Sequence, residues 1–269
     1  MPKLVWFIPQ PAQDIEGYED WYQNEHIPRG MRQEHLQRFR VNRSFYPQPE
    51  CVVLMTGSER PKTYRFSEGY WNSVEDIQSC YVSVHGRAAL ADGPLNILPP
   101  AAPVSQTPSP VLVMEEEIFP IPEELAFNLR EGRYRAPLAC KLFGFVRLKN
   151  GKAEEFDRRY GALANAISSD GALRGHTLSR TLDAVIRPGR AVQWPPVGSE
   201  HFDRAVEYYF ESPEAMGQFC AAGRLKGVTD LFSELGQACF WDATRIQEIF
   251  YTATGDQPLE ENWKALYSH

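Results

Sequence analysis

The chain has 269 residues and is 43% hydrophobic, which is enough to bury a sizeable core in one large domain or two smaller ones. A net charge of -7 without any basic run argues against nucleic acid or an anionic membrane as partner. No apolar run reaches the roughly 18 residues of a membrane span, and the first residues lack the long apolar segment of a secretory signal. Five scattered cysteines without a CxxC pair fit a reduced protein, so we expect a cytoplasmic location.

The first half predicts elements in the order β-α-β-β-α-β. Alternating apolar residues predict strands at Lys3–Pro9, Arg38–Tyr46, Tyr64–Trp71 and Val111–Phe119. A first helix is expected over Asp14–Pro28, with Asp14 as its cap and Gly30 just after its end. Ser73 and Asp76 form a capping box that starts a second helix, which runs to about Leu90. The Pro-rich stretch 93–110 is expected to cross the surface without regular structure.

The second half predicts the same order of elements. Strands are expected at Leu138–Leu148, Leu173–Ile186, Ala205–Glu211 and Thr244–Thr252. Helices are expected over Lys152–Ser168, over Pro213–Cys220 and near Leu225–Leu235. The stretch 187–199 is expected to be a loop, and the residues after Thr254 a loosely docked tail.

An internal repeat relates the two halves. Residues 4–22 align without a gap with residues 142–160. Three shorter matches follow in the same order and at a nearly constant offset: 41–45 with 178–182, 68–76 with 207–215, and 117–119 with 248–250. Four ordered matches indicate duplication, and each copy has the order of a ferredoxin-like unit. We therefore predict an α+β fold of two tandem ferredoxin-like repeats (1–125 and 126–255, then a tail, 256–269). Their antiparallel sheets would pack face to face as an α+β barrel.

The first predicted helix carries an aromatic stripe that ends in ionisable groups. Tyr18, Trp21, Tyr22 and Glu25 recur at helical spacing, and His26 lies four residues after Tyr22.

This stripe, with His26 followed by Pro28, resembles the helix-one motif of the EthD-like family in the dimeric α+β barrel superfamily. The strand ending Glu116-Glu117-x-Phe119 is also similar. The resemblance implies a small cofactor-free enzyme for aromatic or polyketide-like compounds, although related tandem barrels bind haem. The second half departs from the motif, since Ala164 stands in the place of His26.

Three residues are candidates for catalysis. His26 could act as general acid and base, because imidazole titrates near neutral pH; alternatively it holds the end of the helix. Tyr22 could hydrogen-bond a substrate oxygen or belong to the core. His85 lies four residues after Tyr81 in the second predicted helix. It could face the same pocket, face solvent or, in a haem protein, be the axial ligand.

Six residues are candidates for substrate binding, and the aromatic ones could equally fill the barrel core: Trp6, Arg43, Tyr46, Tyr64, Tyr70 and Tyr81. Arg43 matches Arg180 across the repeat, so structural ion pairs with Glu68 and Glu207 compete with a clamp for a substrate carboxylate. The histidines show no metal-binding spacing, and no nucleotide-binding motif occurs. We therefore expect no cofactor and no metal, with haem as the alternative.

The leading hypothesis is a cofactor-independent lyase, a decarboxylase of a phenolic or polyketide-like acid, with His26 as general acid and base. An isomerase, cyclase or dehydratase would use the same groups. The second hypothesis is a redox enzyme, either haem-binding or a metal-free oxygenase, and the third is a small-molecule binding protein without turnover. The expected partner is a small aromatic molecule, and a homodimer is expected. Fold alone does not choose among these functions.

Overall fold

The computed structural model describes residues 2–8, 15–61, 63–86, 111–118, 140–182 and 202–250. The predicted crossing at 93–110, the loop at 187–199, the tail and the boundary between the repeats lie outside these ranges. No helix in the described ranges is long and apolar enough to cross a membrane.

Each predicted strand and helix has a counterpart in the structure. The strands are Pro2–Ile8 (β1), Arg38–Ser44 (β2), Arg65–Tyr70 (β3), Val111–Ile118 (β4), Cys140–Leu148 (β5), Gly175–Thr181 (β6), Arg204–Phe210 (β7) and Gly236–Phe250 (β8). The helices are Ile15–Trp21 (α1), the π-helix Tyr22–His26 (η1), Ile27–Gly30 (α2), Glu50–Thr56 (α3), Val74–Val82 (α4), Ala153–Ser168 (α7), Pro213–Ala221 (α8) and Lys226–Leu235 (α9). Helix α3 was not predicted, and β8 begins at Gly236 rather than at Thr244.

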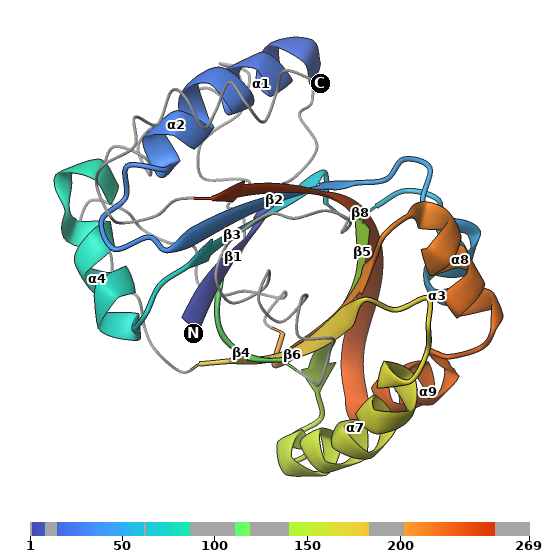
Figure 1. The fold of residues 1–269 in the computed structure, drawn as a ribbon. Coiled ribbons are helices and arrows are strands. Elements are labelled where there is room, and N and C mark those ends of the chain that lie inside the picture. The colour runs from blue at the N-terminus through green and yellow to red at the C-terminus, as the bar shows by residue number, and fades with distance from the viewer. Residues whose placement is uncertain are drawn as a thin grey trace.

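The eight strands close into one antiparallel barrel (Figure 1). The order around the barrel is β1-β3-β2-β8-β5-β7-β6-β4, so the strands of each half lie together. Two seams join the halves, β2 with β8 and β4 with β6. The predicted α+β class is confirmed, and the two sheets are joined at both edges. Closure leaves no unpaired sheet edge among these strands.

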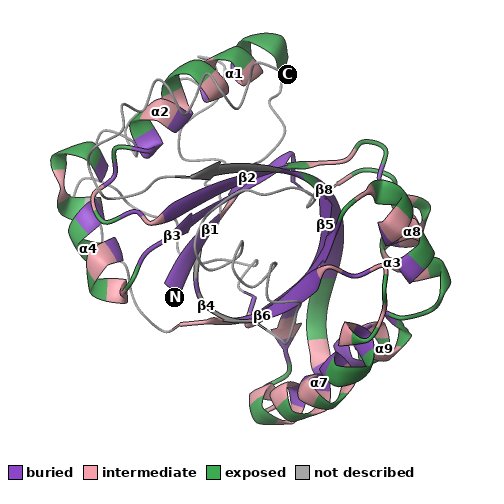
Figure 2. Ribbon diagram, in the orientation of Figure 1, coloured by how far each residue is buried: buried purple, intermediate pink, exposed green. Residues whose placement is uncertain are grey.

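The helices cover the outside of the barrel (Figure 1). Helices α1, α2 and α4 lie over the first-half strands, and α7, α8 and α9 lie over the second-half strands. Helix α3 belongs to the first half by sequence, yet it contacts α8 and β8. Figure 2 shows buried strands inside and helices that expose their outer faces, as expected for amphipathic helices on a barrel.

The interior of the barrel is divided between aromatic and charged side chains. One apolar cluster fills its aromatic part: Val5, Phe7, Phe66, Met114, Phe143, Phe145, Phe202, Ala205 and Phe240. Alternation along each strand sends the neighbouring residues outward, where two further cores lie beneath the helices. Tyr64 precedes β3 and packs against Tyr18 of α1, so it does not share the inward face of Phe66.

The first helix continues through Pro28 instead of ending there. The Ile27 N–H donates to the Tyr22 carbonyl, which is the wide hydrogen bond of a π-turn. Pro28 then falls in the first turn of α2, where its missing N–H costs little. The π-turn keeps the rings of Tyr22 and His26 in contact, with their centroids 5.1 Å apart.

A substitution at Gly144 tests how tightly β5 packs against β8. A Cβ at this position would lie 2.5 Å from the Trp241 ring. We expect Gly144→Ala to lower the free energy of unfolding by about 1–3 kcal/mol, because the ring has to shift. The matched control is Gly161→Ala in α7, where a Cβ meets nothing within 4 Å. The control should be neutral or stabilising by about 0.5–1 kcal/mol. Urea denaturation measures both variants, and equal effects would contradict this packing.

Candidate active site

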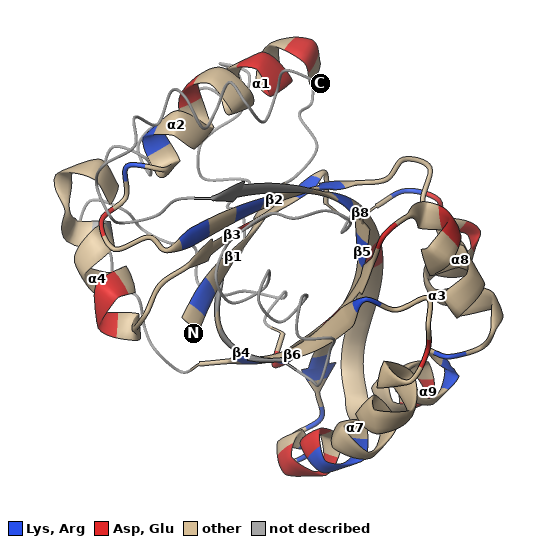
Figure 3. Cartoon of the chain, in the orientation of Figure 1, with Lys and Arg blue, Asp and Glu red and all other residues tan. Residues whose placement is uncertain are grey.

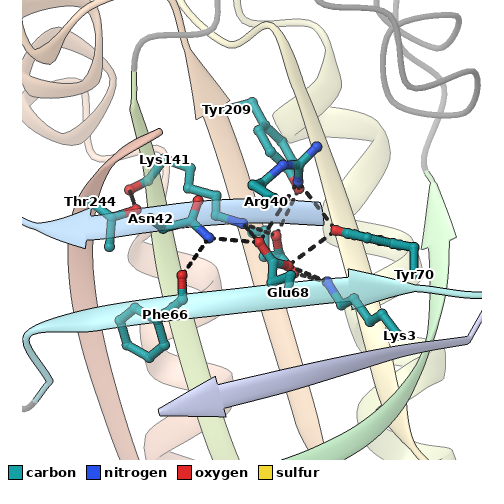
Figure 4. Close-up of polar contacts among 10 residues, drawn as sticks. Lys3, Arg40, Asn42, Phe66, Glu68, Tyr70, Lys141, Tyr209 and Thr244 are labelled. Atoms are coloured by element: carbon teal, nitrogen blue, oxygen red, sulfur yellow. Dashed lines mark hydrogen bonds and ion pairs between the residues drawn. The ribbon is translucent and has the colours of Figure 1, made fainter. Parts of the chain in front are cut away.

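A cluster of buried charged side chains lies in the lumen of the barrel (Figure 4). Lys3 and Lys141 occupy matched positions of the two repeats, as do Glu68 and Glu207, and all four side chains are fully buried. Each lysine contacts both glutamates. Lys3 Nζ lies 3.0 Å from Glu68 and Lys141 Nζ lies 2.7 Å from Glu207, while Lys3–Glu207 and Lys141–Glu68 are the crossed pairs.

Neighbouring side chains complete this lumen network. Arg40 donates to the Tyr209 hydroxyl at 2.8 Å, and the Tyr70 hydroxyl donates to Glu68 at 3.1 Å. Burial alone would raise the pKa of Glu68, but Lys141, Lys3 and Arg40 hold that pKa well below its usual range. The two lysines and two glutamates neutralise one another and come from both halves, so we interpret the network as a structural bridge rather than as a reactive site. Tyr70, predicted to bind substrate, lies here, on the opposite face of the sheet from the helices.

His26 lies outside the barrel, between the first helix and β3. Its ring is half-buried and sits between those of Trp21 and Tyr22, at centroid distances of 4.9 and 5.1 Å. The Tyr22 side chain is fully buried and shares a hydrogen bond with the Ser67 hydroxyl on β3. The predicted stripe therefore places the His26 imidazole beside the aromatic rings that pack between the first helix and β3.

An ion pair also links the first helix to β3 beside the Tyr22 ring. Arg65 Nη2 donates to both carboxylate oxygens of Glu19, at 2.7 and 2.6 Å, and the Tyr64 hydroxyl also donates to Glu19. Burial would raise the pKa of Glu19, but Arg65 lowers it below its ordinary value, so the carboxylate stays ionised. The Arg65 guanidinium lies 4.0 Å from the centroid of the Tyr22 ring, which is a cation–π contact.

The second half has an equivalent ion pair. Asp157 corresponds to Glu19 in the alignment of the two halves. Arg204 binds Asp157 in a bidentate way, with Nε–Oδ1 at 2.8 Å and Nη2–Oδ2 at 3.0 Å. Arg180 adds a third bond to Asp157, at 3.1 Å.

The predicted partners of Arg43 and Arg180 were wrong. Arg43 lies 3.8 Å from Glu19 and Arg180 contacts Asp157, whereas we expected pairs with Glu68 and Glu207. Both arginines face the helices, while the two glutamates face the lumen, because neighbouring strand positions alternate in direction.

We call the side chains packed between helix and sheet the first layer in the first half of the chain and the second layer in the second half. The two layers differ in how many of their buried polar atoms form hydrogen bonds. Among the described residues, the buried Tyr18 hydroxyl, Trp21 Nε1 and the Nε and Nη1 atoms of Arg65 have no hydrogen-bond partner. In the second half Arg204 uses all three of its nitrogens, the third on the Asp203 carbonyl at 2.8 Å, and Phe156 replaces Tyr18. Unpaired buried donors are unusual in a folded protein, so the first layer is the candidate active site.

The second layer is a packed core. His176 is fully buried and bonded on both ring nitrogens, to the hydroxyls of Tyr160 (3.3 Å) and Ser168 (2.8 Å). Burial lowers the pKa of His176 to about 4, so its ring stays neutral at physiological pH. Ala164, which replaces His26, is fully buried in the same core. These satisfied contacts describe a structural histidine.

The remaining predicted residues lie in different places. The half-buried Trp6 lies under the first helix layer, against Phe39 and Trp71. Tyr46 is 71% exposed and His85 is also exposed, so the structure brings neither to His26. The side chain of Tyr81 lies outside the described part of the chain.

The prediction from the sequence did not include three residues of this candidate site, Glu19, Arg65 and Ser67. Arg65 and Arg204, like Glu19 and Asp157, occupy matched positions of the repeat, and that match was the available signal.

Nothing in the described residues groups three side chains suited to a metal ion. Figure 3 shows Lys and Arg on the barrel strands, whereas much of the acidic charge lies on the outer helices. The layer beside His26 thus offers an imidazole, aromatic faces and a buried cation. Such groups can bind a planar, oxygen-rich molecule and transfer a proton.

No protein-family model matches the chain, and no curated protein matches it. Solved structures share its fold at low identity. A proposed monooxygenase from Fusobacterium nucleatum superposes with a TM-score of 0.57 at 7% identity, over 93% of this chain and 96% of that one. An anthrone oxidase-like protein gives 0.57 at 9% identity, over 95% and 94% of the two chains. A chlorite dismutase variant from Candidatus Nitrospira defluvii gives 0.50 at 8% identity, over 98% and 94%. The chain therefore has the α+β barrel fold, and membership of the EthD-like family stays a prediction.

Lys141 tests the structural role of the lumen network. Lys141→Met leaves Glu68 and Glu207 short of a partner inside the barrel, so we expect a loss of about 3–5 kcal/mol in the free energy of unfolding. The matched control is Lys226→Met, which breaks the exposed Lys226–Asp230 pair and should change stability by less than about 1 kcal/mol. Chemical denaturation of both variants measures the difference. Similar losses in the two would show that the network is not a bridge.

Asp242 tests the pH dependence of the fold. It is fully buried, its Oδ1 accepts from Gln48 at 2.8 Å, and burial raises its pKa from 3.8 to about 8 despite hydrogen bonds from Gln48 and Thr63. Between these values the folded chain keeps a proton that the unfolded chain releases, so stability falls as pH rises through this window. Asp242→Asn removes this proton, and its stability should decline less than that of the wild type between pH 5 and 8. Denaturation midpoints across that range check it, and identical slopes would contradict the assignment.

Proposed function

We propose that this protein is an enzyme that uses His26 to transfer a proton on a small aromatic substrate, bound between the first helix and β3. The observation that supports it is the set of unpartnered buried donors around Tyr18, Trp21 and Arg65, next to a half-buried imidazole. The equivalent layer of the second half contains Ala164 and a fully bonded Arg204. A fold that needed these groups only for stability would not leave one copy unsatisfied.

The chemistry follows from the contacts of His26. A neutral imidazole accepts a proton from a phenol or from an acidic C–H group, and Trp21 and Tyr22 offer faces on which an aromatic ring can stack. The hydroxyl of Tyr22 is bonded to Ser67, so Tyr22 shapes the site rather than transferring the proton. We therefore assign catalysis to His26 and leave out His85, which is exposed.

The reaction we place first is oxygenation without a cofactor. Solved structures with this fold include proposed monooxygenases and an anthrone oxidase-like protein. An anthrone has an acidic CH2 group, and proton loss to His26 gives an electron-rich anion. This anion reacts with O2, and the CH2 group becomes a carbonyl while the remaining oxygen atom leaves as water.

The second candidate is the lyase expected from the sequence. A decarboxylase would use His26 in the opposite direction, to protonate the carbon as CO2 leaves. The buried cation of Arg65, in the same layer, suits a carboxylate substrate. The haem alternative fits less well, because its predicted ligand His85 is exposed. Cofactor independence, the homodimer and the cytoplasmic location stay predictions.

His26→Gln tests the proposal, with His85→Gln as the matched control. With anthrone as substrate, we expect oxygen uptake by the wild type and a loss of roughly 10²–10⁴-fold in kcat/KM for His26→Gln, because the proton acceptor is gone. His85→Gln should keep wild-type turnover. An oxygen electrode follows this reaction, and CO2 release from hydroxybenzoates tests the lyase in the same variants. Full activity of His26→Gln in whichever reaction occurs would overturn the role of His26.

A further inference from the structure

We propose that Arg65, Tyr18 and Trp21 form an oxyanion-binding end of this site, so that it prefers an aromatic carboxylate or a phenolate, including the anion that proton loss from an anthrone gives, over an uncharged ring. The inference rests on the proposed function for its location beside His26. It adds the chemical class of the ligand and three residues that determine specificity.

Arg65 supplies the charge. Its guanidinium is fully buried beneath the first helix, and Nη2 alone is used by Glu19. Nε and Nη1 are buried without a hydrogen-bond partner in the described structure. Glu19 already balances the charge of Arg65, but buried donors without an acceptor are costly to maintain. Arg204, in the matched position, shows the satisfied alternative with three occupied nitrogens.

Tyr18 supplies a neutral donor. Its ring contacts those of Trp21, Tyr22 and Tyr64, at centroid distances of 5.7–5.9 Å, and its hydroxyl has no partner among the described residues. Burial raises the pKa of Tyr18, so the hydroxyl keeps its proton and can donate. Phe156 fills this position in the second half, which shows that the fold does not require the oxygen atom.

Trp21 links these donors to the base. Its indole Nε1 is a third buried atom without a partner in the described part of the chain, and its ring lies 4.9 Å from that of His26. Guanidinium and indole groups can only donate. A ligand that satisfies them must be rich in acceptors, and next to Arg65 an anion is favoured over a neutral carbonyl. A phenolate or carboxylate held there brings the rest of its ring toward His26.

The test compares two isosteric probes, 2-naphthoate and 2-naphthamide, by isothermal titration calorimetry. We expect the wild type to bind the anion about tenfold more tightly than the amide, as a charged hydrogen-bond set implies. Tyr18→Phe should weaken naphthoate binding several-fold while its Tm stays equal or rises, because no existing hydrogen bond is lost. Arg65→Gln should abolish the preference for the anion. Arg174→Gln, which removes an exposed cation of the second half, should keep that preference.

Equal affinity of the wild type for both probes, or no naphthoate binding at millimolar concentration, overturns the inference. So does an equal loss of preference in Arg174→Gln and Arg65→Gln, since the effect would then reflect net charge. If Arg65→Gln fails to fold, Tyr18→Phe still decides the question. His26→Gln should retain the preference for naphthoate, so a failure of the proposed catalysis remains distinguishable from a failure of the oxyanion site.

Discussion

The buried charges of the barrel lumen are the interaction on which the rest of this structure depends. Lys3 and Lys141 each contact Glu68 and Glu207, so the charges of one half are neutralised partly by those of the other. A charge that is buried away from water is strongly destabilising when its partner is missing. The two sheets must therefore face each other in one register, and the seams between β2 and β8 and between β4 and β6 follow from that arrangement.

The lumen network joins the two halves of the chain, whereas the side chains packed between helix and sheet outside the barrel differ between them. Both copies keep an acidic residue on the helix and an arginine on the strand beneath it, Glu19 with Arg65 and Asp157 with Arg204. In the second half this pair is complete, with a third bond from Arg180 to Asp157. In the first copy the pair is incomplete and lies beside His26. Arg204 thus uses all three of its nitrogens, whereas Arg65 keeps two buried nitrogens without a hydrogen-bond partner among the described residues.

Much of the fold could be predicted because the internal repeat and the alternation of strand residues are visible in the sequence itself. The π-turn in the first helix and the early start of β8 could not, since packing rather than propensity decides them. The site was predicted where its residues share one helix, as Trp21, Tyr22 and His26 do. Arg65 was missed because it reaches this helix from a distant strand, and the partners of Arg43 were wrong because a shift of one strand position reverses the face. The exposure of Tyr46 and His85 depends on loop and helix ends, which the sequence pattern does not specify.

Strand β8 has a further consequence for the order of folding. It pairs with β5 along its first part and with β2 along its last part, from Thr244 to Phe250. Strand β2 is synthesised early, and its partner lies about two hundred residues later in the chain. During translation the β2 edge of the first-half strands would stay unpaired until β8 emerges. Such long-range pairing slows folding and leaves the nascent chain open to wrong associations, so the barrel closes only after β8 has been synthesised.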